Sequence, residues 1–169
     1  MRTRFATLVL AATVVAFSVI PTPAHAETIH ADLVGYQEVP ALSTGAAGAF
    51  RAKIDADRES LTYELTYENL AAAVQQAHIH VGQPSVNGGI AIFLCTNVGN
   101  GPVGTPACPG PTSGAVSGTV DGAAVVGPTS QGIAPGEFAE VLAAITAGVA
   151  YVNVHSATFP TGELRGQLQ

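Results

Sequence analysis

Cationic side chains are scarce in this sequence, and their scarcity excludes two classes of partner. The 169 residues contain six Lys and Arg against twelve Asp and Glu, which gives a formal net charge of −6. Nucleic acids and anionic lipid surfaces are bound by clustered cations that neutralise their negative charges. We therefore expect this chain to bind neither of them.

Long apolar runs are lacking after the first twenty residues. Arg2 and Arg4 precede an apolar stretch over residues 5–20, and a small-x-small cleavage site follows at residues 24–26. This order is typical of a secretory signal peptide, and the stretch is short for a bilayer span of about 20 residues. The sequence predicts a signal peptide over residues 1–26. We expect a secreted or extracytoplasmic single domain over residues 27–169, with no membrane span in the mature form.

Cysteine is rare as well, since Cys95 and Cys108 are the only two. They bracket a stretch rich in Gly, Pro and Asn, and an even cysteine count in an exported chain favours a disulfide. Two thiols this far apart, with no His beside them, lack the paired spacing of a structural zinc site. The sequence therefore predicts a Cys95–Cys108 disulfide that closes the intervening loop.

Alternating apolar residues are abundant, and they predict strands rather than helices. Residues 48–54 and 61–67 each place apolar side chains on one face, and the polar connection between them has hairpin length. Further strands are predicted over residues 28–34, 90–95 and 116–120. A short helix is predicted near residues 135–147, between a proline suited to a first turn and a glycine suited to a C-cap. The expected fold is all-β, an antiparallel Greek-key-like sandwich or barrel-like sheet with this one short α-helix.

Three of the predicted strands share an unusual polar face. The strand Ala77-His78-Ile79-His80-Val81 alternates imidazole and aliphatic side chains, and the C-terminal segments at residues 151–155 and 163–168 carry polar groups at alternate positions. Because residues i and i+2 of a strand point to the same side, each segment gathers polar groups on one face. The candidate polar network consists of His78, His80, Asn153, His155, Glu163 and Arg165.

Two interpretations of this face stay open. In the structural interpretation the groups form a buried hydrogen-bond network, with Arg165 paired to Glu163 or to another carboxylate. In the metal interpretation His78, His80 and His155 offer three imidazoles to Zn²⁺ or Cu²⁺. An open position on such an ion could activate water, so a metal-dependent enzyme is a further alternative. Beyond this network, no set of catalytic residues is indicated.

The motifs resemble those of a known family. The segments at residues 77–82, 87–94, 148–155 and 160–168 are similar, in this order, to those of the CHRD (chordin) domain in its bacterial secreted single-domain form. The resemblance covers residues 28–169 and implies an exported β-rich domain of uncharacterised activity, with no family catalytic residue to transfer. In animals the domain recurs in chordin, an extracellular signalling antagonist, beside cysteine-rich modules that this chain lacks.

The resemblance and the composition together favour a non-catalytic module. We expect an extracellular binding or structural role toward an unknown protein or surface ligand. The loop at residues 96–112 is the expected contact segment. Metal binding at the three histidines, with Zn or Cu as the cofactor, is the alternative.

Overall fold

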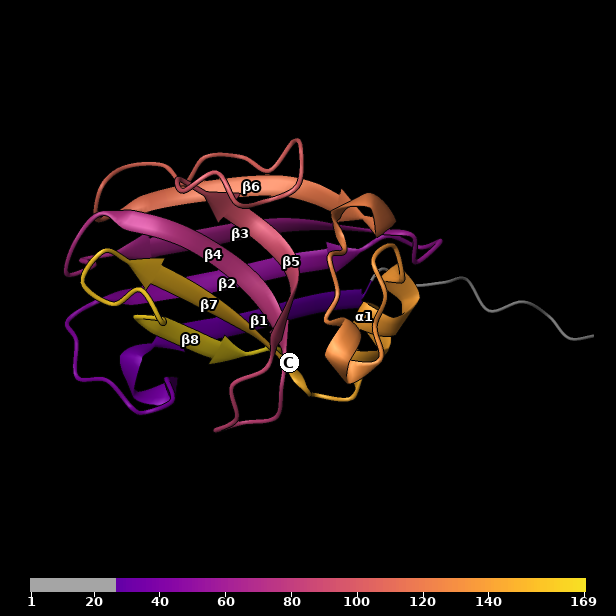
Figure 1. Cartoon of the computed structure of the whole chain (residues 1–169), viewed down its shortest axis with the longest axis horizontal. Coiled ribbons are helices and arrows are strands. Elements are labelled where there is room, and N and C mark those ends of the chain that lie inside the picture. Colours follow the sequence, from indigo (N-terminus) through magenta and orange to yellow (C-terminus); the bar gives the residue numbers. More distant parts are fainter. Residues whose placement is uncertain (1–26) are drawn as a thin grey trace, which may run out of the picture.

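The computed structural model describes residues 27–169, and the predicted signal peptide at residues 1–26 lies outside them. The strands are β1 (Glu27–Val34), β2 (Ala47–Ile54), β3 (Ser60–Glu68), β4 (Val74–Val81), β5 (Gly89–Thr96), β6 (Gly114–Asp121), β7 (Ala150–Ser156) and β8 (Leu164–Gln167). They form one sheet of eight antiparallel strands in the order β5-β4-β7-β8-β1-β2-β3-β6 (Figure 1). The prediction of an antiparallel all-β fold is confirmed.

The sheet curls until its two end strands approach each other. A single bridge joins Ile92 of β5 to Val125, just after β6, and the Tyr63 hydroxyl of β3 donates to the Leu94 carbonyl at 2.6 Å. The sheet is therefore a nearly closed barrel rather than a sandwich of two sheets. Its interior is filled by the apolar side chains that alternate along each strand, Ile29, Leu33, Phe50, Leu65, Ile79, Val152, Val154 and Leu164 among them.

The predicted hairpin is present and runs through the full length of β2 and β3. Phe50 lies opposite Leu65 and Ala52 lies opposite Tyr63, so the apolar residues of both strands face the barrel interior. Cross-strand pairs of this kind fix the register of two neighbouring strands. The five strands predicted from apolar patterning are each found, one or more residues longer than predicted, and the three predicted with a polar face correspond to β4, β7 and β8.

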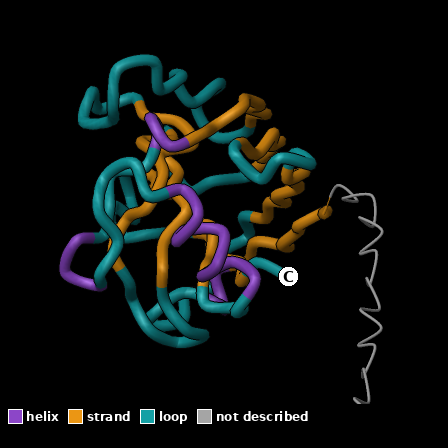
Figure 2. The backbone as a smooth tube through the Cα atoms, turned by 90° about the vertical axis from the view of Figure 1, so that its right-hand side faces the viewer, coloured by secondary structure: helices purple, strands orange, loops and turns teal. Residues whose placement is uncertain are grey.

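The helix α1 (Phe138–Thr146) begins later than the predicted residue 135. Gly136 adopts a positive φ of 92°, and the Ala134 amide donates to the Glu137 carboxylate at 2.7 Å, so this segment is a turn that leads into the helix. Four buried side chains of α1 pack on one end of the barrel, the end that faces the viewer in Figure 2: Phe138, Val141, Leu142 and Ile145. Within residues 27–169, no helix has the length and apolarity needed to cross a bilayer.

Burial differs sharply between the two halves of the sheet. β1, β2 and β3 alternate buried and exposed residues, as expected for strands with one face in solvent. In contrast, every residue of β7 is buried, and so are the last five residues of β4. The outer face of β4, β7 and β8 is therefore covered, and this is the face that carries the predicted polar network.

Two irregularities in β5 change which of its residues lie opposite the residues of β4. The register slips by one residue between Ala77 and His78 and again between Ile79 and His80, so Leu94 and Ala91 of β5 have no partner on β4. These are β-bulges, which break the simple alternation of facing. They place Phe93 opposite His78. They also explain why β5 buries residues in adjacent pairs instead of at alternate positions.

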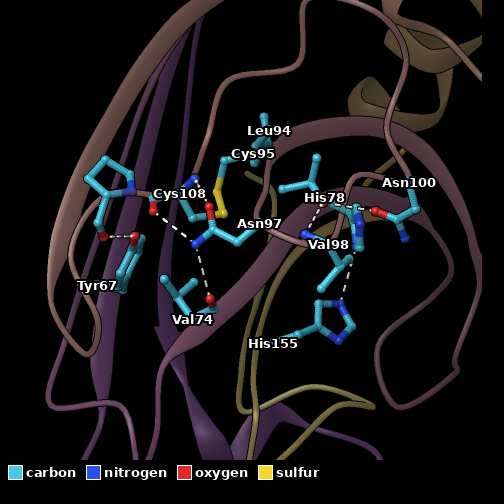
Figure 3. The surroundings of a disulfide bond; sticks show 12 residues. Tyr67, Val74, His78, Leu94, Cys95, Asn97, Val98, Asn100, Cys108 and His155 are labelled. Atoms are coloured by element: carbon cyan, nitrogen blue, oxygen red, sulfur yellow. Dashed lines mark hydrogen bonds between the residues drawn. A yellow bond between two sulfur atoms is a disulfide. The ribbon is translucent and has the colours of Figure 1, made fainter.

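The predicted disulfide between Cys95 and Cys108 is present (Figure 3). The Asn97 side chain reinforces it from inside the loop. Its amide donates to the carbonyls of Val74 and Cys108, at 3.1 and 3.0 Å, and its oxygen accepts from the Cys108 amide at 3.0 Å. The loop from β5 to β6 is thus tied to the start of β4.

Candidate metal centre

The three predicted histidines come together on the outer face of β4 and β7. His78 lies opposite Asn153 and His80 lies opposite Tyr151, while His155 pairs with Gln76 at the end of the ladder. The aliphatic neighbours between them point into the barrel. The sequence alternation thus separates imidazole and core side chains onto opposite faces of the same two strands.

The imidazoles approach within coordination range of one another. One nitrogen of each ring can be chosen so that the three nitrogens lie within 4.8 Å of one another. His78 Nδ1 is 3.1 Å from His155 Nε2, an interaction drawn as a dashed line in Figure 3. In a tetrahedral zinc site with bonds of about 2.0–2.1 Å, two ligand nitrogens lie about 3.3 Å apart. The His78–His155 pair already lies near this separation, and separations of up to 4.8 Å within the cluster would have to shorten for it to close around one ion.

Backbone carbonyls fix the tautomers of two of these rings. His80 Nδ1 is 2.9 Å from the Gly88 carbonyl, and His155 Nδ1 is 3.0 Å from the Pro160 carbonyl. A carbonyl oxygen only accepts, so both Nδ1 atoms carry the proton and both Nε2 atoms carry a lone pair. His155 Nε2 must then accept from His78 Nδ1, which leaves a lone pair on His78 Nε2 as well.

Two of these lone pairs have no partner. His78 Nε2 and His80 Nε2 are buried side-chain nitrogens without a hydrogen bond. Buried polar atoms are nearly always satisfied, and an orphaned one costs about 1–3 kcal/mol. The lone pair of His80 Nε2 is thus free for a metal ion, and in its other tautomer His78 would offer Nδ1 beside His155 Nε2, so the residues present fit an ion.

Burial keeps the three rings neutral. Burial, together with the positive charges that His155 and His80 would carry, lowers the pKa of His78 to about 2. Burial also lowers the pKa of His80 to about 4, against the raising effect of its bond to Gly88, and it lowers the pKa of His155. Neutral imidazole is the form that binds metals, so at neutral pH no proton has to be displaced.

Gly88 is the residue that lets the backbone reach this cluster. A Cβ at this position would lie 1.7 Å from the Val81 carbonyl oxygen, so no other residue fits without moving the strand. Its amide donates to the Tyr151 hydroxyl at 3.1 Å while its carbonyl accepts from His80. One glycine therefore orients both an imidazole and a phenol.

Tyr151 joins the histidines to Arg165. Its ring is stacked on the His80 ring at 4.8 Å between centroids, and the Arg165 guanidinium carbon lies 3.5 Å from the Tyr151 centroid. Arg165, 1% exposed, donates through Nη2 to the carbonyls of Gln83 and Val86, both at 3.0 Å. The guanidinium thus holds the segment between β4 and β5 over the outer face of the sheet.

A buried acid that the sequence did not single out faces this arginine. Glu38 accepts a short hydrogen bond from the Asn153 amide, which also donates to the Leu164 carbonyl at 3.0 Å. Burial raises the pKa of Glu38 to about 7, although the charge of Arg165 and its hydrogen bonds act to lower it. Asn153 therefore ties the segment after β1 to the outer face.

Glu163 lies apart from Arg165, so the pairing considered from the sequence does not form. Its carboxylate accepts from the Thr44 hydroxyl and the Ala71 amide, each at 2.9 Å, and from the Ser156 hydroxyl. Because β8 begins only at Leu164, strand alternation does not extend to Glu163. This carboxylate binds three separate segments together, and the histidine cluster contains no carboxylate of its own.

The model of the CHRD domain matches residues 29–168, nearly all of the described chain. The chain belongs to the CHRD family. The match confirms the family resemblance of the sequence motifs, and both the histidine cluster and Arg165 lie inside the matched CHRD region. No curated protein and no solved structure is significantly similar to this chain.

Two buried side chains of the outer face in this CHRD domain, Tyr151 and Glu38, were not identified as candidates from the sequence. Tyr151 carried a usable signal, because it shares the alternation of Asn153 and His155 and so lies on their face. Glu38 carried none, since it lies just after a short 3-10 turn, Gly35–Gln37, where no strand period applies. Its position depends on how that segment folds back over β7 and β8.

Proposed function

We propose that this protein is an exported, non-catalytic CHRD module that binds one zinc or copper ion through His78, His80 and His155. The observation that carries the proposal is the convergence of three neutral imidazoles, each with one nitrogen within 4.8 Å of a nitrogen of the other two. Imidazole nitrogens suit both metals. The carbonyls of Gly88 and Pro160 supply the outer hydrogen bonds that commonly orient metal-binding histidines.

Enclosure of the rings supports binding rather than turnover. His78 is fully buried, and His80 and His155 are 8% and 6% exposed. A substrate must reach a catalytic ion through an open coordination position, as in zinc hydrolases. A bound ion at this position would instead be held beneath the side chains of β4, β5 and β7, where it would stabilise the fold or be stored.

Metal analysis of the mature, untagged chain tests this proposal. We expect one equivalent of zinc or copper in the wild-type protein after titration and dialysis, and none in a His78→Ala/His80→Ala double variant. His30→Ala is the matched control, because His30 lies exposed on β1, outside the cluster, and its stoichiometry should equal that of the wild type. Equal metal content in the double variant, or no binding above its background in the wild type, would contradict the proposal.

A second candidate function is contact with an extracytoplasmic protein through the loop closed by the disulfide. Val98 and Val103 in this loop are 50% and 108% exposed, and exposed apolar side chains are characteristic of contact surfaces when they gather. Replacement of residues 96–112 by a short Gly-Ser linker should then abolish capture of a partner from envelope extracts. Equal capture by the wild type and the loop variant would rule this function out.

A further inference from the structure

The charge around the histidine cluster distinguishes one ion from another. The group contains three imidazoles and no carboxylate or thiolate. The two buried acids among the described residues are already engaged, since Glu38 bonds to Asn153 and Glu163 bonds to Thr44, Ala71 and Ser156. An ion bound by the three rings would therefore keep its full positive charge.

A fixed cation lies close to the same cluster. The Arg165 guanidinium rests on Tyr151, and Tyr151 is stacked on His80, so one aromatic ring connects the arginine to a ligand. The nearest balancing carboxyl, Glu38, has a pKa raised to about 7 and so is only partly ionised at neutral pH. The surroundings thus oppose added positive charge, and they oppose a double charge more than a single one.

Burial strengthens this discrimination. The idealised cost of moving an ion from water into a low-dielectric site grows with the square of its charge, so a divalent ion meets about four times the penalty of a monovalent ion. The edge of the Phe93 ring packs on His78 with centroids 4.4 Å apart, which adds an apolar wall on the β5 side. Little water is available to lower the cost.

The number of available ligands also favours a singly charged ion. Structural zinc is almost always four-coordinate, and in the described chain the cluster offers three nitrogens. The hydroxyl of Tyr151, whose ring is stacked on His80, already accepts from the Gly88 amide. A cuprous ion is satisfied by two or three ligands in a linear or trigonal arrangement, which three buried imidazoles provide.

We propose that the three-histidine site selects Cu(I) over both Zn²⁺ and Cu²⁺. This inference rests on the proposed function and narrows it to one ion of single charge. No redox step is involved, because the ion enters and leaves the site as Cu(I). The role that follows is sequestration of cuprous ion outside the cytoplasm.

Anaerobic competition measures the selectivity directly. The mature wild-type chain is titrated into the coloured Cu(I) complex of bicinchoninate, and separate titrations with zinc- and Cu²⁺-binding dyes give the other two affinities. We expect Cu(I) to bind at least about 100-fold more tightly than either divalent ion. X-ray absorption of the loaded protein should show a cuprous edge and three nitrogen neighbours.

The outcomes separate this inference from the proposed function. Tighter binding of Zn²⁺ or Cu²⁺ at the three histidines would overturn the preference for Cu(I) and leave the metal site standing. Absence of binding for all three ions would overturn both. His80→Gln should lose Cu(I) affinity while His30→Ala retains it, and equal affinity in these two variants would show that copper binds elsewhere.

Discussion

Replacement of Arg165 by Met gives the sharpest test of how the outer face is held together. The change keeps an unbranched apolar stem and removes the guanidinium that stacks on Tyr151 and donates to Gln83 and Val86. If the arginine is a structural anchor, the variant should be strongly destabilised with or without metal.

The expected magnitude follows from these contacts. Two partly buried hydrogen bonds from a charged donor would be lost, at about 1.5–3 kcal/mol apiece, and a desolvated cation–π contact contributes about 2 kcal/mol. The flexible stem of Met recovers part of this loss through apolar burial. We expect the free energy of unfolding to fall by about 4 kcal/mol, which lowers the melting temperature by about 10–15 °C for a domain of this size.

Urea denaturation at pH 7 measures the change, and Arg58→Met is the matched control. Arg58 makes an ion pair with Glu27 at 2.9 Å, but both side chains are about half exposed, and such surface pairs contribute about 0–1 kcal/mol. If the two variants differ by less than about 1 kcal/mol, Arg165 does not anchor the outer face.

Two further predictions concern Glu38 and the disulfide. Because the pKa of Glu38 is raised from 4.5 to about 7, its contribution to stability is complete below pH 4.5 and is lost as the pH rises through 7. The free energy of unfolding of Glu38→Gln, relative to that of the wild type, should therefore rise by about 2–3 kcal/mol from pH 5 to pH 8. The same difference between the two proteins at both pH values would disprove the raised pKa of Glu38. Replacing both cysteines by Ala should lower the free energy of unfolding by about 3 kcal/mol, since the bridge closes a loop with a sequence separation of 13. Unchanged urea denaturation would contradict this estimate.

The sequence predicted the strands because the barrel interior imposes a period of two. Residues 48–54 and 61–67 show it clearly, since the core contains every second residue of each: Phe50, Ala52 and Ile54 in one, and Leu61, Tyr63, Leu65 and Tyr67 in the other. The same period placed His78 and His80 on one face, which is where the structure has them. Local alternation is enough for this because neighbouring side chains of a strand must point to opposite sides.

The partners of the polar residues could not be predicted, because they come from segments without a period. Glu38 reaches Asn153 from a sequence separation of 115 residues, and Glu163 reaches Ala71 from 92. Arg165 donates to backbone carbonyls of the segment between β4 and β5. Every residue has such a carbonyl, so the sequence does not indicate which ones an arginine will bond. The carboxylate pairing considered for Arg165 assumed that β8 extended through Glu163, whereas the strand begins one residue later.

The two bulges of β5 carry a consequence for changes in chain length. Each bulge adds one residue to β5, and that residue is buried beside a buried neighbour, Leu94 beside Cys95 and Ala91 beside Ile92. The residues beyond each bulge therefore keep their facing, with Phe93 opposite His78 and Ile90 opposite His80. A single insertion or deletion in β5 is compatible with the barrel where a bulge forms or disappears, while elsewhere it would shift the register and exchange the two faces of the strand.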